Sequence, residues 1–270
     1  MSVRSNVQAL LIDLDGTVYF KGEPIPGAVE AIRELRGRGF GLLFLTNTDS
    51  QTRKALAQKL NASGLAIAEH EILTCVQAGL AYVKEKSGRA VCLMAKELAA
   101  EFESLGGAEG PVRFVVVGDP RENASYANLN EAFRHVMAGA EIVALQKGRF
   151  FLTPDGPNLD TGAIVAMLEY AAGRQSVVMG KPSVAFFQAA LNQLGVERDQ
   201  AAVVGDDIDS DIAGASGMGM QSILVRTGKF GDRALPATGP QPTIIIDSIA
   251  HLPRVVTARA NENLVDSTGT

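Results

Sequence analysis

The chain has 270 residues, of which 46% are hydrophobic and 20% charged, and its formal net charge is −5. This length suits one large or two ordinary domains and can supply a substantial core. The acidic balance, the scattered Lys and Arg residues and the absence of Trp argue against a nucleic-acid-binding surface. No apolar run approaches the roughly twenty residues of a membrane helix, so we expect neither nucleic acid nor a membrane as partner.

The first part of the chain alternates between strand and helix. The expected elements are a strand over 7–13, a helix over 27–38 and a strand over 41–45. The second strand ends in Thr46-Asn47-Thr48. Ser50 then has the character of an N-cap for a helix that carries Leu56 and Leu60 at helical spacing.

The middle of the chain reads as a separate unit. Strands are expected at 90–94, 113–117 and 141–145, with helices between them. We interpret residues 81–175 as an α/β domain inserted into a first domain that comprises residues 1–80 and 176–270. The last stretch, 257–270, is polar and lacks periodicity, and we expect it to be frayed.

After the insertion, the alternation of strand and helix resumes. Strands are predicted at 176–179, 201–204, 222–225 and 243–246. Uninterrupted apolar strands that alternate with helices are typical of a parallel sheet covered by helices on both faces. The predicted fold class is therefore α/β, a Rossmann-like doubly wound parallel sheet with an inserted α/β domain.

Cysteine usage indicates a reducing compartment. Only Cys75 and Cys92 are present, each inside an apolar segment, which predicts reduced, buried thiols rather than a disulfide or a catalytic thiol. The N-terminus passes directly into the first strand and has no signal-peptide pattern. We therefore expect a cytoplasmic protein.

Two carboxylates follow the first strand directly, in Asp13-Leu14-Asp15-Gly16-Thr17. Residues two apart in a strand point to the same side, so Asp13 and Asp15 begin close together. Two nearby anions repel unless a cation or a proton separates them. The alternative is a turn with a helix cap, because Asp and Gly are common turn residues.

Polar side chains also follow three other predicted strands. The four clusters are Asp13/Asp15, Thr46/Asn47, Lys181 and Asp206/Asp211. In open α/β sheets, ligands bind outside the carboxyl ends of the strands, so these clusters are expected to converge on one crevice. Carboxylates, one ammonium and a hydroxyl-amide pair together suit a divalent cation and a phosphate.

The chemistry of the clusters suggests a division of roles. Oxygen ligands without His suit Mg²⁺, with Asp13 and Asp206 as direct ligands and Asp15 offering its backbone carbonyl. An ionised Asp13 can attack phosphorus without a base, while Asp15 protonates the leaving group and later deprotonates water. The expected phosphate-binding residues are Thr46, Asn47 and Lys181. Thr17 and Asp211 are expected to support the metal ligands without binding the cation directly.

Four ordered motifs carry a family resemblance. They are Asp13-Leu14-Asp15-Gly16-Thr17, Thr46-Asn47, Gly180-Lys181-Pro182 and Gly205-Asp206-x4-Asp211. Together they resemble the motifs of the haloacid dehalogenase superfamily of phosphohydrolases. An insertion between the second and third motifs is the mark of subfamily IIA, which has a type-two cap. The resemblance implies a Mg²⁺-dependent phosphatase for small phosphorylated compounds, a cap that governs substrate choice, and a homodimer.

The sequence of the inserted domain, which would be the cap, narrows the resemblance to one group. Segments 128–133, 144–151, 158–162 and 168–171 are similar to the phospholysine phosphohistidine inorganic pyrophosphate phosphatase group. Two places depart from the wider branch: the second motif reads Thr-Asn-Thr, and the cap has Ala144-Leu145-Gln146 where many relatives have Ala-Thr-Asn. These departures weaken the transfer of a nucleotide or sugar-phosphate specificity, so pyrophosphate, phosphoamides and small phosphomonoesters all remain candidate substrates.

Several polar residues have structural interpretations instead. Asp207 and Asp209 are expected to be surface or capping residues, and Asp211 is either a support for the metal or a helix cap. The three histidines share no spacing and are not expected to be ligands. The cap residues that either face the substrate or form a solvated surface are Lys147, Arg149 and Asp160.

Three other functions compete with a phosphatase. A phosphomutase of the same superfamily needs a cap that excludes water, and a carbon–halogen hydrolase needs neither a metal nor the second aspartate. A receiver-like signalling module also combines acidic residues, Mg²⁺, a phosphorylated Asp, a Thr and a Lys. It lacks, however, both a second carboxylate beside the nucleophile and an inserted domain.

Overall fold

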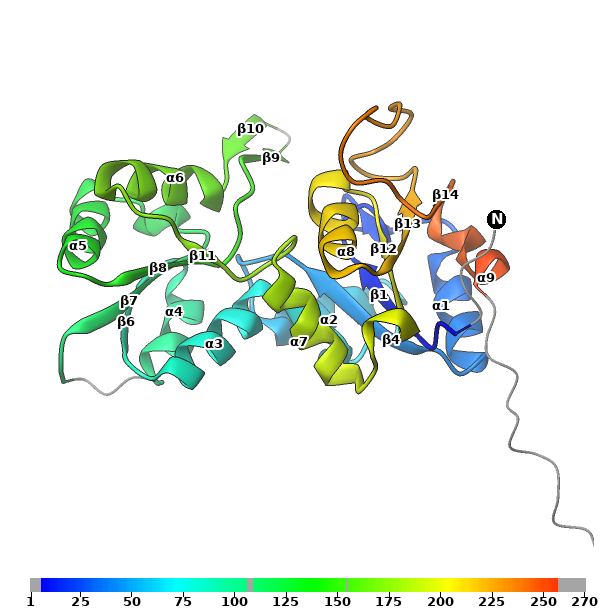
Figure 1. Ribbon diagram of the computed structural model, residues 1–270, viewed down its shortest axis with the longest axis horizontal. Coiled ribbons are helices and arrows are strands. Elements are labelled where there is room, and N and C mark those ends of the chain that lie inside the picture. Colours follow the sequence, from blue (N-terminus) through cyan, green and yellow to red (C-terminus); the bar gives the residue numbers. More distant parts are fainter. Residues whose placement is uncertain (1–5, 106–108, 154, 257–270) are drawn as a thin grey trace, which may run out of the picture. The chain divides into compact units, whose positions relative to one another are not determined.

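The computed structural model describes residues 6–105, 109–153 and 155–256 (Figure 1). The predicted frayed stretch, 257–270, lies outside the described residues. Within the described part of the chain, no helix is long and apolar enough to cross a membrane.

A parallel sheet of six strands forms the core of the predicted doubly wound fold. Its order is β14-β13-β12-β1-β4-β5. The strands are β1 (Ala9–Asp13), β4 (Gly41–Thr46), β5 (Ile72–Thr74), β12 (Ala201–Gly205), β13 (Gln221–Val225) and β14 (Ile244–Ile246). Every residue of β1 and β12 is buried, as expected for central strands covered on both faces. The predicted parallel α/β sheet is confirmed.

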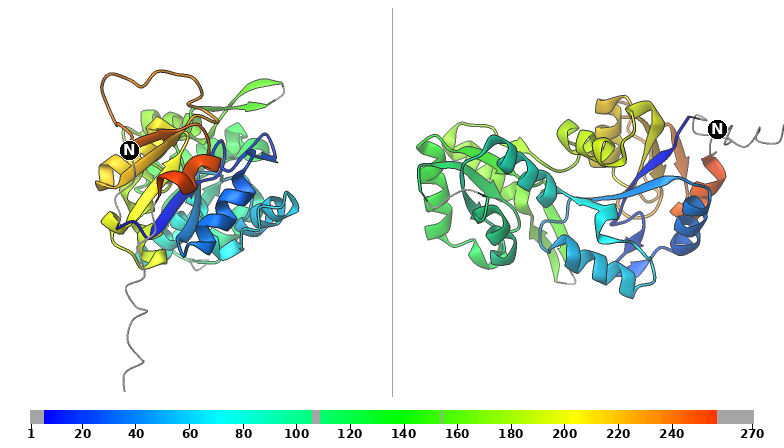
Figure 2. Two further views of the ribbon diagram at one scale, coloured as in Figure 1. Left: turned by 90° about the vertical axis from the view of Figure 1, so that its right-hand side faces the viewer. Right: turned by 90° about the horizontal axis from the view of Figure 1, so that it is seen from below.

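Helices alternate with these strands, and the first of them agrees to within one residue at each end with the helix predicted over 27–38. They are α1 (Ala28–Gly37), α2 (Arg53–Ala62), α7 (Val184–Leu194), α8 (Ala213–Met218) and α9 (Leu252–Val255). Helix α9 lies beside α1 (Figure 2), and the Arg38 guanidinium fixes this packing by donating to the carbonyl of Pro253 at 2.5 Å. A short hairpin, β2 (Tyr19–Phe20) with β3 (Glu23–Pro24), follows β1.

A second parallel sheet has the order β11-β8-β7-β6 and lies in the middle of the chain (Figure 1). Its strands are β6 (Arg89–Leu93), β7 (Val112–Val117), β8 (Glu141–Ala144) and β11 (Val177–Val178). Helices α3 (Cys75–Lys86) and α4 (Lys96–Glu103) share one hydrophobic cluster with Phe114 and Val116 of β7. Helices α5 (Tyr126–Met137) and α6 (Thr161–Ala172) share another with Val115 and Val117. The alternation along β7 therefore places two helices on each face.

Strand β11 departs from the sequence-based expectation. Residues 176–179 were expected to continue the first sheet, but Val177 and Val178 pair in parallel with Val143 and Ala144 of β8. The amide of Met179 extends this pairing to the carbonyl of Ala144 at 2.8 Å. Because a short apolar strand carries no signal for its partner, the sequence could not distinguish the two sheets. Lys181 therefore follows an edge strand of the second sheet.

The N-cap of α2 is also corrected. The sequence indicated Ser50, whereas Thr52 has the extended backbone of an N-cap and its side chain accepts a hydrogen bond from the amide of Ala55 at 3.2 Å. We expect Thr52→Ala to lower the free energy of unfolding by about 1 kcal/mol, because an amide of the first turn loses its acceptor. Chemical denaturation would measure this loss. Ser50→Ala is the matched control, and an equal loss in both variants would contradict the assignment.

Contacts along the chain divide it into two units. One joins the residues up to Leu43 to those from Leu191 onward, and the other comprises Phe44–Ala190. The second unit thus includes residues 44–80 and 176–190, which the sequence assigns to the first domain. The sequence-based boundaries follow the order of motifs rather than contacts, and they stay a prediction.

Candidate active site

Three buried carboxylates lie together at the carboxyl ends of β1 and β12. Asp13, Asp206 and Asp211 each offer an oxygen within 4.8 Å of the others. Asp13, Asp206 and Asp211 are 6%, 2% and 1% exposed, respectively. The register explains the proximity of the first two, because Ile12 pairs with Val204 and both strands run in the same direction. The sequence predicted that Asp13 and Asp206 would converge, and the structure brings them together.

Asp211 reaches this group through an unusual turn. Residues Ile208–Ile212 form a π-helical turn, in which the amide of Ile212 bonds to the carbonyl of Asp207 at 3.2 Å. The Asp211 carboxylate also accepts from the amide of Asp207 at 3.2 Å. A Cβ on Gly205 would collide with this carboxylate, so glycine there makes room for it. Asp211 is therefore both a cap of its turn and a member of the carboxylate group.

The loop of residues 227–229, which was not predicted as part of the site, holds Asp206. The amide of Lys229 donates to its carboxylate at 2.5 Å, and the Thr227 hydroxyl donates to the carbonyl of Gly16 at 2.5 Å. Gly16 and Gly228 have φ of 91° and 63°, and a Cβ on either would collide with the Asp206 carboxylate. A Thr-Gly-Lys run that begins two residues after the end of β13 is the signal that could have identified this loop.

Asp207 has the predicted capping role. Its carboxylate accepts from the amide of Asp209 at 2.9 Å and pairs with the exposed Lys229 ammonium at 2.7 Å. The Lys229 side chain therefore pairs with this carboxylate at the mouth of the turn, while its backbone amide holds Asp206.

Asp15 differs from its neighbour Asp13 in environment. It is exposed, and its carboxylate accepts a hydrogen bond from the Tyr19 hydroxyl at 3.0 Å. Burial, and then the negative charge of Asp15, raises the pKa of the Tyr19 hydroxyl well above its usual range, so Tyr19 stays a donor. The Asp15 carboxylate is not part of the buried group. Tyr19 is a second residue that sequence reasoning missed.

The donor set fits a divalent cation. Three buried anions within 4.8 Å of one another repel strongly in a medium of low polarity unless a cation lies among them. Carboxylate oxygens are the ligands that Mg²⁺ and Ca²⁺ prefer. Thr17 is fully buried in the same turn, and within the described residues its hydroxyl has no hydrogen-bond partner. The supporting role of Thr17 stays a prediction.

The predicted phosphate-binding residues form a second group, in the unit of residues 44–190. The Asn47 amide donates to the carbonyl of Lys181 at 3.0 Å, and its oxygen accepts from the Lys181 amide at 2.8 Å. Glycine at position 180 permits this approach, because a Cβ there would collide with Asn47. Thr46 is 2% exposed, and its hydroxyl accepts from the amide of Thr48 at 3.0 Å. Asn47 therefore fixes the backbone that carries Lys181.

A buried carboxyl follows this group directly. Asp49 is 5% exposed and accepts a hydrogen bond from the Thr161 hydroxyl at 2.6 Å. Burial raises the pKa of the Asp49 carboxyl to about 7, and the charges of Asp160 and Asp119 add to the effect, although the bond from Thr161 opposes it. This role of Asp49 was not predicted, because its hydrogen-bond partner Thr161 lies 112 positions away in the sequence.

The raised pKa of Asp49 makes a prediction about stability. Between the ordinary pKa near 3.8 and the folded value of about 7, the folded state binds more protons than the unfolded state, so ionising Asp49 destabilises the fold as pH rises. Asn lacks this penalty. We expect Asp49→Asn to be more stable than the wild type at pH 8, and this gain to be far smaller at pH 5. Each unit by which folding raises the pKa of Asp49 corresponds to about 1.4 kcal/mol of the gain. Urea unfolding at both pH values measures this, and a gain that is independent of pH would contradict it.

The structure shows the surroundings of the three cap residues for which the sequence left two roles open, a contact with substrate or a solvated surface. Lys147 pairs with Glu169 at 2.8 Å, which is a structural ion pair. Asp160 caps α6 by accepting from the amide of Thr161 at 2.8 Å. Arg149 is exposed.

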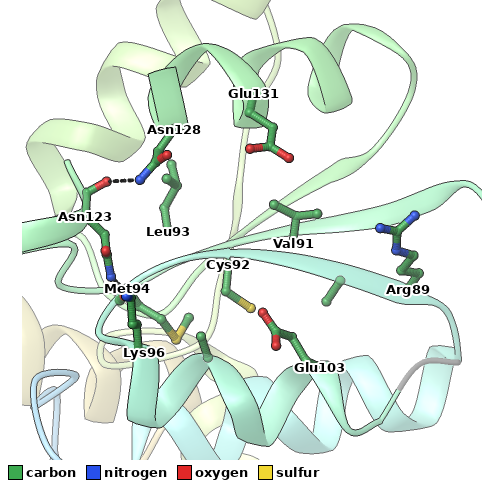
Figure 3. A pocket seen from close by; sticks show the side chains of 12 residues that line it. Arg89, Val91, Cys92, Leu93, Met94, Lys96, Glu103, Asn123, Asn128 and Glu131 are labelled. Carbon is green, nitrogen blue, oxygen red and sulfur yellow. Dashed lines mark hydrogen bonds between the residues drawn. The ribbon is translucent and has the colours of Figure 1, made fainter. Parts of the chain in front are cut away.

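A separate pocket of about 570 Å³ lies along the edge strand β6, between α4 and α5 (Figure 3). Its wall combines the apolar Val91 and Leu93 with the charged Arg89, Lys96 and Glu103. None of the residues predicted for the active site lines it. The pocket therefore takes no part in the site described above.

Both cysteines are free, as the sequence predicted. Cys75 is fully buried, and burial raises the pKa of its thiol. Cys92 is only partly buried, contrary to expectation, because it lies on the edge strand β6; burial still raises the pKa of its thiol to about 12. Neither thiol is suited to nucleophilic chemistry.

Comparison with known proteins relates this chain to a large group of hydrolases. A model described as haloacid dehalogenase-like hydrolase matches residues 10–108, and one described as HAD-hydrolase-like matches residues 178–252. Phospholysine phosphohistidine inorganic pyrophosphate phosphatase of Xenopus laevis is 35% identical, with 96% of this chain and 98% of that protein covered.

Solved structures agree with these matches. The p-nitrophenyl phosphatase from Archaeoglobus fulgidus is 28% identical, has a TM-score of 0.85, and is aligned over 93% of this chain and 99% of its own. A glycerol phosphate phosphatase from Mycobacterium tuberculosis in complex with calcium is also 28% identical, with a TM-score of 0.80 and coverage of 93% and 76%.

The chain therefore belongs to the haloacid dehalogenase superfamily of hydrolases, in its subfamily IIA of phosphatases with a type-two cap. The gap between the two matched segments, 109–177, covers most of the predicted insertion, and each matched segment contains two of the four motifs. The family predicted from those motifs is confirmed.

Proposed function

We propose that this protein is a Mg²⁺-dependent phosphatase that hydrolyses small phosphorylated compounds through a covalent aspartyl-phosphate on Asp13. The observation that carries the proposal is the buried group of Asp13, Asp206 and Asp211 at the ends of β1 and β12. The carboxylates of Asp13 and Asp206 and the backbone carbonyl of Asp15 would hold the cation, with Asp211 beside them. When bound, the cation would supply positive charge that reduces the repulsion between a carboxylate and a phosphate.

The two aspartates of the first motif would divide the reaction. The Asp13 carboxylate attacks phosphorus, and the bond from phosphorus to the leaving oxygen breaks as Asp15 donates a proton to that oxygen. Asp15 then takes a proton from a water molecule that attacks the acyl phosphate, which releases phosphate and restores Asp13. The hydrogen bond from Tyr19 supports this role, because it fixes the orientation of the Asp15 carboxylate.

Thr46, Asn47 and Lys181 are proposed to hold the remaining phosphoryl oxygens as charge develops on them. The reciprocal hydrogen bonds between Asn47 and the Lys181 backbone support a joint role for these residues. We assign the choice of substrate to the inserted domain, predicted as residues 81–175.

The names of the relatives suggest substrates to test. They include inorganic pyrophosphate, phosphoamides of lysine and histidine, glycerol phosphate and 4-nitrophenyl phosphate. The free thiols agree with a reducing compartment such as the cytoplasm. A homodimer is implied by the family resemblance alone.

The proposal is tested by phosphate release from these compounds with and without Mg²⁺. We expect release that depends on Mg²⁺ and is lost with a chelator, because the buried carboxylates repel an anionic substrate when no cation is bound. Release that persists in the chelator would contradict the metal-dependent mechanism. A stable phosphorylated protein without turnover would indicate a receiver-like module instead.

A further inference from the structure

A buried hydrogen bond joins the turn after β4 to the first residue of α6. The Thr161 hydroxyl donates to Asp49 at 2.6 Å, and the two residues are 1% and 5% exposed. Both lie in the unit of residues 44–190. A buried polar pair of this kind costs free energy if either partner is removed, so its presence constrains the backbone on both sides.

On the α6 side, the backbone of Thr161 is held by a chain of further hydrogen bonds. Asp160 accepts from the amide of Thr161 at 2.8 Å and from the Gln146 amide group at 2.6 Å. The Gln146 oxygen in turn accepts from the amide of Gly148. The turn after β8 and the start of α6 are therefore fixed to each other, and they present Thr161 in one position.

On the other side, Asp49 belongs to the same turn as Thr46 and Asn47. The amide of Thr48 holds the Thr46 hydroxyl at 3.0 Å, and the Asn47 side chain holds the Lys181 backbone. The carbonyl of Thr48 also lies 3.6 Å from the buried Cys75 thiol. A shift of Asp49 would therefore move the backbone that orients all three proposed phosphate-binding residues.

We propose that Asp49 and Thr161 are positioning residues that hold the phosphate-binding turn from the N-terminus of α6. This rests on the proposed function, because it takes Thr46, Asn47 and Lys181 as the groups that bind phosphate. The pair touches no reacting atom. It acts by fixing the turn, and displacements of about 1 Å can reduce catalysis by up to about a hundredfold.

Thr161→Val tests the proposal, because it keeps the shape of the side chain and removes the donor. The measurements are KM and kcat for 4-nitrophenyl phosphate with Mg²⁺, and the inhibition constant of inorganic phosphate, all on the full chain. We expect the inhibition constant and KM to rise about tenfold, and Thr161→Ser to stay within about twofold of the wild type. Unchanged phosphate binding in folded Thr161→Val would overturn the proposal.

Asp49 variants provide the other half of the test. Asp49→Asn keeps an acceptor and should bind phosphate within about twofold of the wild type, whereas Asp49→Leu should match Thr161→Val. If the residues act as a pair, the double variant should lose less than the sum of the two single losses. Fully additive losses would overturn the pairing. Should Thr161→Val fail to fold, Thr161→Ala carries the same expectation.

Ser125→Ala is the matched control. Ser125 is exposed and caps α5 in the same unit by accepting from the amide of Asn128 at 3.2 Å, so its loss removes a hydroxyl that bonds to a helix terminus away from the Asp49–Thr161 pair. We expect its phosphate inhibition constant to be unchanged, and a rise equal to that of Thr161→Val would reduce the pair to a general structural role. If the wild-type protein shows no Mg²⁺-dependent phosphate release, the proposed function itself is refuted. If the wild type is active and the Thr161 and Asp49 variants bind phosphate as it does, only the positioning role is refuted.

Discussion

Asp13→Asn is expected to reduce kcat for 4-nitrophenyl phosphate by at least about a thousandfold while the fold survives. The amide of Asn has no anionic oxygen with which to attack phosphorus, so no aspartyl-phosphate forms. The same change removes one of three buried negative charges that lie within 4.8 Å of one another. The variant should therefore melt at the temperature of the wild type or above it when no divalent cation is present.

Two measurements decide this prediction. Steady-state phosphate release gives kcat, and thermal unfolding shows that the variant is folded. Asp232→Asn, in an exposed loop, is the control for replacing a carboxylate by an amide and should keep wild-type activity. Substantial turnover by Asp13→Asn would exclude covalent catalysis at this residue and move the nucleophile elsewhere.

The strands of the first sheet show what the sequence could predict. Residues 9–12 and 201–204 are continuous apolar runs, and such runs are typical of strands buried on both faces. Because the side chains after parallel strands meet at one edge, Asp13 and Asp206 could be brought together without coordinates. Their separation of almost two hundred residues was no obstacle, since the topology rule does not depend on distance along the chain.

Other residues of the site were not predicted from the sequence, because their roles depend on contacts that a local pattern does not show. Lys229 holds Asp206 through its backbone amide, an interaction available to almost any residue type, so its side chain gives no signal. Tyr19 reaches Asp15 only because a hairpin turns the chain back after β1. Strand β11 pairs with β8 although its sequence suits either sheet. Pairing, turn geometry and long-range burial decide these features, and none of them is encoded in a local pattern.

Asp211→Asn separates the two roles that the sequence left open for this residue. The carboxylate caps its own turn by accepting from the amide of Asp207 at 3.2 Å, and it also belongs to the buried group that could hold a cation. Asn keeps an acceptor for the cap and loses the charge. If Asp211 helps to hold the cation, the Mg²⁺ concentration for half-maximal activity should rise about 10- to 100-fold.

Thermal unfolding gives a readout that does not depend on turnover. A cation that binds only the folded state raises the melting temperature, and the concentration needed for that rise should increase in Asp211→Asn in parallel with the activity. Asp209→Asn, an exposed residue of the same turn, should change neither quantity. An unchanged Mg²⁺ requirement in Asp211→Asn would restrict Asp211 to capping the turn. The ligands would then be Asp13, Asp206 and the Asp15 carbonyl.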